Sequence, residues 1–62
     1  MKIIYDIELA GFRICLRQYG KDRFSVQYGL QDNMSLTYAE AEKELGRCIM
    51  HACSCEGRLT NS

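Results

Sequence analysis

Two stretches near the start of the chain alternate between apolar and polar residues. Every second side chain is apolar in residues 2–9, and the same pattern returns in residues 12–18. Alternation with a period of two is typical of a half-buried β-strand. Between them, Ala10-Gly11 fits a two-residue hairpin turn, in which Gly11 supplies a positive φ although Ala10 is not ideal. The pattern therefore predicts an antiparallel hairpin.

The register of this hairpin follows from the length of its turn. A two-residue loop sets Leu9 opposite Phe12, so that apolar residues meet apolar residues along one face. On the other face Glu8 would lie opposite Arg13 and Ile4 opposite Arg17, and no like charges would meet. The expected apolar face of the hairpin consists of Ile3, Tyr5, Ile7, Leu9, Phe12, Ile14 and Leu16.

A third strand and a helix are predicted after a polar turn at residues 19–23. Residues 24–30 alternate again, with Phe24, Val26, Tyr28 and Leu30 on the apolar side, and residues 31–35 read as a connection. Thr37 and Glu40 form a capping box, so the helix should cover residues 38–56 and end at Gly57. Its apolar stripe consists of Tyr38, Ala41, Leu45, Cys48, Ile49, Ala52 and Cys55.

These elements predict one small α+β domain. A three-stranded antiparallel meander would pack against one C-terminal helix, in the order β-β-β-α and in two layers. The domain should span residues 1–57, with residues 58–62 as a polar tail.

Composition narrows the functional classes. The 62 residues include eight Lys and Arg against eight Asp and Glu, so the chain has no strong basic field for nucleic acid. No apolar run is long enough to cross a bilayer, and Asp6 and Glu8 interrupt any secretory signal. We expect a cytoplasmic protein whose cysteines are reduced and act as small apolar residues.

The cysteines near the C-terminus raise the question of metal or nucleophilic chemistry. Cys48, His51, Cys53 and Cys55 lie within eight residues, and thiolates and imidazole are the ligands that zinc prefers. On a helix, however, residues 48, 51 and 55 span about 10 Å along the axis, so one ion could not collect all three. A Cys-His dyad is feasible at one-turn spacing, but no residue obviously orients the imidazole. We expect no enzyme, cofactor or metal, and a small zinc module is the third alternative.

The charged face of the sheet suggests a second alternative. Arg13, Arg17 and Arg23 could contact phosphates, and the β-β-β-α order resembles in topology the integrase arm-binding and plant AP2-type domains. Asp6 and Glu8 lie on the same face and would repel phosphates. A nucleic-acid-binding module is therefore the alternative reading, and a solvated face with cross-strand ion pairs is favoured.

A second stripe on the helix suggests a partner. Ala39, Gly46, Met50 and Cys53 lie away from the centre of the apolar stripe and could form a seam for another helix. Gly46 costs about 1 kcal/mol relative to Ala in a helix interior, a cost that close approach of a partner would explain. We therefore predict protein–protein interaction with homodimer formation through this seam.

The strings FRICLRQYGKDRFSVQYGLQ and LTYAEAEKELGRCIMHACSCEG resemble small orphan proteins of lambdoid phages and enterobacterial prophages. The resemblance covers nearly the whole chain, and it implies a protein that acts early in infection by binding and redirecting a host protein. It carries over no site residues.

Overall fold

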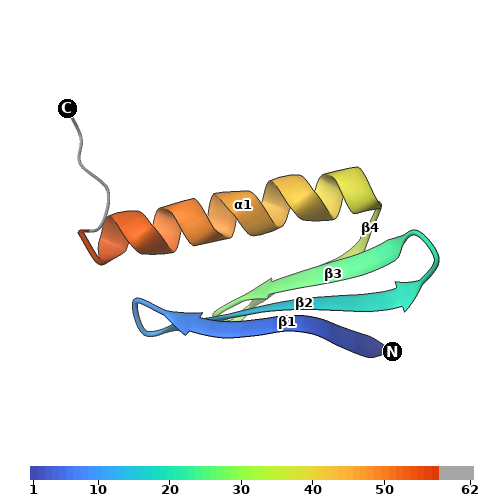
Figure 1. Ribbon diagram of the computed structural model, residues 1–62, viewed down its shortest axis with the longest axis horizontal. Coiled ribbons are helices and arrows are strands. Elements are labelled where there is room, and N and C mark those ends of the chain that lie inside the picture. Colours follow the sequence, from blue (N-terminus) through green and yellow to red (C-terminus); the bar gives the residue numbers. More distant parts are fainter. Residues whose placement is uncertain (58–62) are drawn as a thin grey trace.

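Four strands and one helix make up residues 1–57, the part of the chain that this computed structural model describes. The strands form one antiparallel sheet in the order β1-β2-β3-β4, and the helix α1 lies across one of its faces (Figure 1). The α+β class and the two layers agree with the prediction, but the sheet has four strands instead of three. The elements are β1 (Lys2–Leu9), β2 (Phe12–Gly20), β3 (Arg23–Tyr28), β4 (Gln31–Leu36) and α1 (Tyr38–Cys55).

The fourth strand consists largely of residues that we predicted to be a connection. The chain reverses directly after Tyr28, in a two-residue turn whose first residue, Gly29, has a φ of 62°. Glycine is favoured at this place because a side chain strains a positive φ. Leu30, predicted to lie on the apolar face, is the second turn residue and is fully exposed. The sequence pattern did not predict this strand, because it is a mostly polar, exposed edge strand without alternating apolar residues.

The first hairpin has the predicted turn and register over most of its length. Ala10 and Gly11 both have positive φ values, 56° and 78°, as a primed turn requires. Leu9 pairs with Phe12, and the pairing continues outward from the turn with the predicted partners as far as Tyr5 and Leu16.

The start of β1 departs from the prediction. The register shifts between Ile3 and Tyr5, so that Ile4 is an extra residue and Ile3, not Ile4, lies opposite Arg17. This β-bulge moves Ile3 to the sheet face opposite the helix, where we had expected Ile4. The alternation did not reveal the bulge because Ile3 and Ile4 are both apolar.

The core lies between α1 and the middle of the sheet. The buried residues of the helix are all small, namely Ala41, Cys48 and Ala52, so the helix approaches the sheet closely over β2 and β3. The side chains of Ile14 on β2 and Val26 on β3 are completely buried. The buried cluster comprises Leu9, Ile14, Phe24, Val26, Ala41, Cys48 and Ala52.

The face of the sheet away from the helix is less solvated than we predicted. Cys15 lies there between Arg13 and Arg17 in the strand, and it is 1% exposed. Ser25 on β3 is also completely buried. Since no other element of residues 1–57 packs on this face (Figure 1), neighbouring side chains of the sheet must cover both residues.

The helix begins and ends as predicted, within one residue. The Thr37 hydroxyl accepts a hydrogen bond from the Glu40 N–H at 3.3 Å, and the Glu40 carboxylate accepts one from the Thr37 N–H at 2.9 Å. Asp22, from the β2–β3 turn, accepts the Tyr38 N–H at 2.8 Å and satisfies a further free donor of the first turn. At the other end Gly57 has a φ of 75°, the conformation that commonly ends a helix. The predicted tail lies outside the described residues.

Candidate binding surfaces

One flank of α1 is joined to the sheet by polar contacts. The Asn33 side chain, on β4, donates a hydrogen bond to the Glu44 carboxylate at 3.1 Å. About two turns further along the helix, the Tyr28 hydroxyl of β3 lies 2.7 Å from His51 Nδ1. These contacts connect the helix to the strands farthest from β1 and close this flank, which we call the polar flank.

Charge on the polar flank is balanced within the chain. Arg47 donates a hydrogen bond to the Glu44 carboxylate, and this bond holds the pKa of Glu44 below its ordinary value of 4.5. Cys48 lies beneath this pair, with its sulfur 3.8 Å from Glu44, and burial raises the pKa of its thiol. The thiol at position 48 is therefore held in its neutral form and is not a reactive nucleophile.

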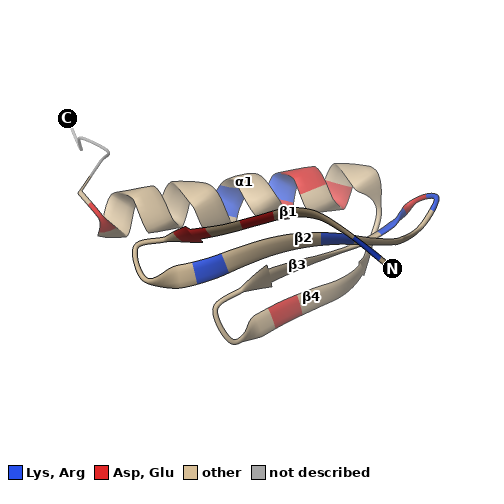
Figure 2. Cartoon of the chain, turned by 60° about the horizontal axis from the view of Figure 1, so that its bottom comes forward, with Lys and Arg blue, Asp and Glu red and all other residues tan. Residues whose placement is uncertain are grey.

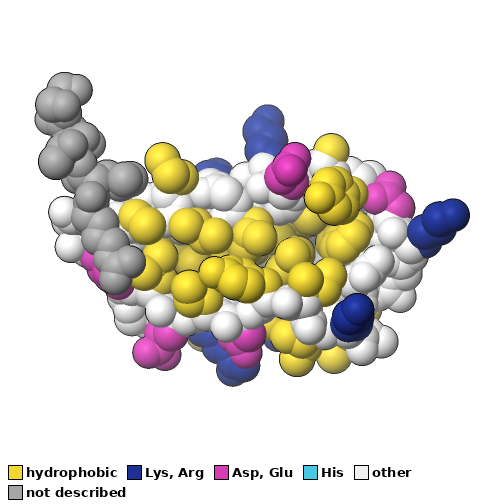
Figure 3. Space-filling view, in the orientation of Figure 1, with side chains coloured by type: hydrophobic (Ala, Val, Ile, Leu, Met, Phe, Trp, Pro, Cys, Tyr) yellow, Lys and Arg dark blue, Asp and Glu magenta, His cyan; other side chains and the backbone are white. Residues whose placement is uncertain are grey.

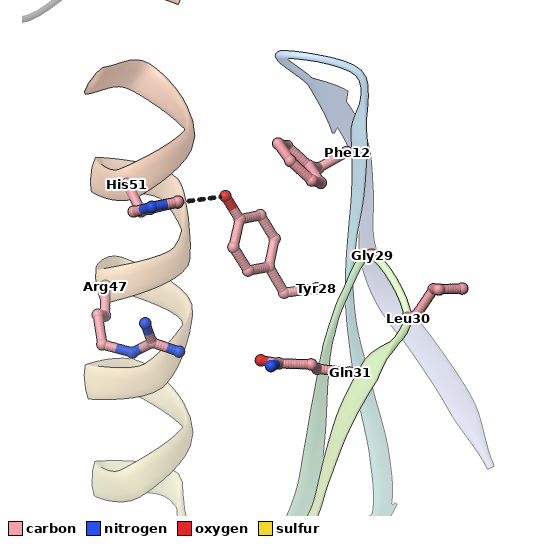
Figure 4. Close-up of a pocket in the computed structure, with 7 residues that line it drawn as sticks. All are labelled: Phe12, Tyr28, Gly29, Leu30, Gln31, Arg47 and His51. Atoms are coloured by element: carbon pink, nitrogen blue, oxygen red, sulfur yellow. Dashed lines mark hydrogen bonds between the residues drawn. The ribbon is translucent and has the colours of Figure 1, made fainter. Parts of the chain in front are cut away.

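A cleft of about 450 Å³ opens on the same flank. Tyr28 reaches from the sheet to His51 across the cleft, Arg47 and Gln31 point toward each other, and Leu30 points away (Figure 4). The Phe12 and Tyr28 rings are 5.1 Å apart and form its aromatic wall. Burial raises the pKa of Tyr28, so its hydroxyl keeps its proton at neutral pH. The polar groups in the cleft thus mainly bind one another.

The surroundings of His51 differ from the prediction. We expected no residue to orient its imidazole, but Tyr28 does so, with its ring at right angles to the imidazole and 5.7 Å away. The Cys55 sulfur lies 4.0 Å from the same Nδ1 atom. Since Tyr28 already binds this nitrogen at 2.7 Å, the histidine is placed as a structural partner of the sheet and not as a base for Cys55.

The opposite flank of α1 carries an uncovered apolar surface. At about 100° per residue, Leu45, Ile49 and Cys53 lie on the side of the helix away from Glu44 and His51, and each is only partly buried against the core. Below them are apolar side chains of β1 and β2 on the same face of the sheet. We call this surface the apolar band: Tyr5, Ile7, Leu16, Leu45, Ile49 and Cys53.

The apolar band is continuous on the surface. In Figure 3 hydrophobic side chains fill the middle of the visible face, between the helix and the front strand, and charged side chains lie around the margin. The band exists because one helix, about 10 Å wide, covers roughly two strands spaced about 4.8 Å apart. Tyr5 on β1 is accordingly 42% exposed.

The four predicted seam residues continue the band toward solvent. Ala39, Gly46 and Met50 are exposed on α1, and Cys53 is partly buried where the seam meets the band. No atom comes within 4 Å of a Cβ built on Gly46, so nothing in the described chain requires glycine there.

The three arginines proposed for nucleic acid occupy the face away from the helix, and two of them have acidic partners. Arg13 makes two hydrogen bonds to Asp6, at 3.0 and 2.5 Å. Arg17 lies 3.7 Å from Asp32 and also donates to Gln27 at 2.5 Å. Arg23, exposed at the start of β3, lies apart from this network. Figure 2 shows acidic positions on β1 and β4 and the basic positions of β2 between these two strands.

The cysteines and the histidine do not converge. Within residues 1–57 no group of three or more His, Cys, Asp or Glu side chains could hold a metal ion. Cys15 and Cys48 are buried on opposite faces of the sheet, and all four cysteines are free thiols. The same residues contain no helix that is long and apolar enough to cross a membrane.

We compared the chain with protein-family models, curated proteins and solved structures. No protein-family model matches the chain, and no curated protein or solved structure matches it.

Proposed function

We propose that the protein works by noncovalent protein–protein interaction, with no bond made or broken. The apolar band carries this proposal. An apolar surface that is continuous and rimmed by charges is the usual mark of an interaction site, because exposure of such a surface to water is unfavourable. The proposal includes both self-association and binding of a second protein.

The nature of the second protein follows from the resemblance to small phage proteins. We propose a bacterial host protein as the partner and the host cytoplasm as the place of action. The mechanism is steric: the bound chain occupies a surface of its partner. The contact of 2.7 Å between Tyr28 and His51, which binds the two polar groups to each other, supports a binding role over a catalytic one.

Nucleic-acid binding is the weaker candidate. Neutralisation of phosphates dominates affinity for nucleic acid, and two of the three arginines that would supply it are already paired with Asp6 and Asp32. A retardation assay with duplex DNA and RNA at low salt tests this candidate directly. Binding that weakens steeply with salt would favour it over the protein-binding proposal.

Affinity capture with matched variants tests the proposal. We compare the tagged wild-type chain with two variants. Ile49→Gln interrupts the apolar band, and Met34→Gln also replaces an apolar side chain with glutamine, but at a 56% exposed residue of β4. Wild type and Met34→Gln should capture the same bacterial proteins, and Ile49→Gln should lose them.

A folding control accompanies the capture experiment. Ile49→Met keeps an apolar side chain of similar size, so it should restore capture, and circular dichroism should show a helical fold in all variants. Equal capture by wild type and a folded Ile49→Gln variant would show that the band is not the binding surface.

A further inference from the structure

The cleft on the polar flank stays open because the β3–β4 turn puts no side chain into it. Gly29, the first turn residue, has no side chain, and Leu30, the second, points away from the cleft (Figure 4). The helix contributes Arg47 and His51 on the other side. The volume of about 450 Å³ lies within the range of small-molecule sites in proteins, roughly 300–1,000 Å³. The cleft therefore has room for a ligand, and the chemistry of its walls determines which one.

One wall of the cleft is aromatic. The rings of Phe12 on β2 and Tyr28 on β3 have their centres 5.1 Å apart and are tilted by 48° to each other. Phe12 is 39% exposed, although it lies on the face of the sheet that the helix covers. Aromatic rings pair favourably with a further ring through their faces or their edges. This wall favours a ligand that contains a planar aromatic ring.

Unused hydrogen-bond donors lie on two sides of the cleft. Arg47 donates to Glu44 and contacts Cys48 through Nη2 alone, so its Nε and Nη1 atoms have no partner within residues 1–57. Gln31, at the start of β4, points toward Arg47 (Figure 4). Its side-chain amide has no hydrogen-bond partner in the same part of the chain. A ligand atom between the two side chains could accept hydrogen bonds from both.

The contact between Tyr28 and His51 leaves a further donor. The hydroxyl and the neutral imidazole carry one proton each, and their 2.7 Å contact uses only one of these two protons. Both residues line the cleft, whereas no acidic side chain of residues 1–57 lines it. Donors without a nearby acid recognise an acceptor that carries negative charge.

Glu44 limits the charge that such a ligand can carry. Its carboxylate already forms an ion pair with Arg47, and no second Lys or Arg among the described residues lines the cleft. A dianion such as phosphate would therefore bring more negative charge than the site can balance. A carboxylate brings a single charge, and its two oxygens match the planar edge of a guanidinium group.

We propose that this cleft binds a small aromatic carboxylate. The ligand ring packs against Phe12 and Tyr28, and its carboxylate accepts hydrogen bonds from Arg47 and from the Gln31 amide. The site lies on the polar flank, away from the apolar band, so this inference goes beyond the proposed function.

Titration with indole-3-acetate and with its uncharged analogue indole-3-acetamide tests the proposal. In amide NMR spectra, both probes should shift the signals of Gly29, Leu30 and Gln31, which line the cleft. We expect a dissociation constant of about 1 mM or lower for indole-3-acetate, as is usual for a ligand of this size. Indole-3-acetamide should bind at least about fivefold more weakly, because it lacks the charged acceptor.

Arginine variants separate the contact in the cleft from a general effect of charge. Arg47→Gln should weaken binding of indole-3-acetate at least about fivefold and leave binding of indole-3-acetamide unchanged. Arg47→Lys keeps the charge and should restore part of the preference for the carboxylate. Arg23→Gln removes the same charge from an exposed residue outside the cleft, so it should change neither affinity. Circular dichroism should show a helical fold in all three variants.

Three results would overturn the inference. The first is the absence of shifts at Gly29, Leu30 and Gln31 with about 5 mM indole-3-acetate. The second is a set of shifts centred on Leu45 and Ile49, which would place the ring on the apolar band. The third is equal affinity for the two probes, or unchanged binding of indole-3-acetate by a folded Arg47→Gln variant. None of these results bears on the proposed function, which the Ile49 variants test separately.

Discussion

The two flanks of α1 differ in how far the chain covers them. On the polar flank, Glu44 and His51 bind Asn33 and Tyr28, so the helix and the sheet satisfy each other's polar groups. On the other flank, Ile49 and Ile7 are only partly buried, and nothing in residues 1–57 lies over them. One flank closes within the chain, and the other leaves apolar surface that a second molecule can cover.

Truncation of isoleucines should show the largest difference between the closed centre and the open flank. Ile14→Ala removes a completely buried side chain and should lower the free energy of unfolding by about 3–4 kcal/mol. Ile7→Ala, at a partly buried position of the apolar band, should cost about 1 kcal/mol, since less surface leaves water there. Urea unfolding at low protein concentration measures both values. Equal losses would mean that the open flank is as well packed as the centre.

Two glycines should respond in opposite directions to the same substitution. Gly29→Ala places a side chain at a φ of 62° with its Cβ 3.4 Å from the Phe12 ring, and should cost about 1–2 kcal/mol. Gly46→Ala has open space and should stabilise the helix by up to about 1 kcal/mol. Thermal unfolding of both variants measures the signs.

Gly46→Ala also tests self-association through the predicted seam. If helices meet closely along the seam of Ala39, Gly46, Met50 and Cys53, the added methyl group should weaken the dimer. If the copies meet through another surface, dimerisation should not change. Sedimentation of this variant therefore tests the seam.

Removal of one hydroxyl from each flank should show a smaller contrast. Tyr28→Phe breaks the 2.7 Å contact with His51 and should cost about 1 kcal/mol. Tyr5→Phe, on the open flank, should change the free energy of unfolding by less than about 0.5 kcal/mol. A loss at Tyr5 as large as that at Tyr28 would contradict the division into flanks.

The sequence predicted the parts of this fold that repeat a strong local pattern. The first hairpin, the capping box at Thr37 and the end of the helix at Gly57 each have a local signature that no tertiary contact overrides. The β4 strand has no such local signature, because an exposed edge strand does not need apolar residues at alternate positions. The signal that could have revealed it was Gly29, whose place after an apolar run marks a tight turn.

The candidate surfaces were less accessible to sequence analysis. The helical wheel placed Leu45 and Ile49 toward the sheet, but the width of the sheet decides whether they are covered. The contact between Tyr28 and His51 joins residues 23 positions apart, and no periodicity reports such a pair. The bulge at Ile4 was hidden because Ile3 and Ile4 are both isoleucines, so hydrophobicity does not show which of them is the extra residue.

Acid should lower the free energy of unfolding by a modest amount, because it protonates Glu44 on the polar flank. The Arg47 hydrogen bond lowers the pKa of Glu44 in the fold, so the carboxylate stabilises the protein above about pH 4.5 and loses this effect as the pH falls through the lowered pKa. The pKa of Asp6 is lowered in the same way by Arg13. Urea unfolding between about pH 5 and about pH 3 should therefore show falling stability, and Glu44→Gln should remove part of the slope. An unchanged slope would show that Glu44 makes no such contribution.

Hydroxyl-radical footprinting at increasing protein concentration tests most directly whether a second molecule covers the apolar band. The Tyr5 side chain is 42% exposed in the single chain, so it should react freely in dilute protein and become protected as the concentration rises. Met34, which is 56% exposed on β4, should react at the same rate throughout. Protection that grows at Met34, while Tyr5 continues to react freely in the associated protein, would contradict this account.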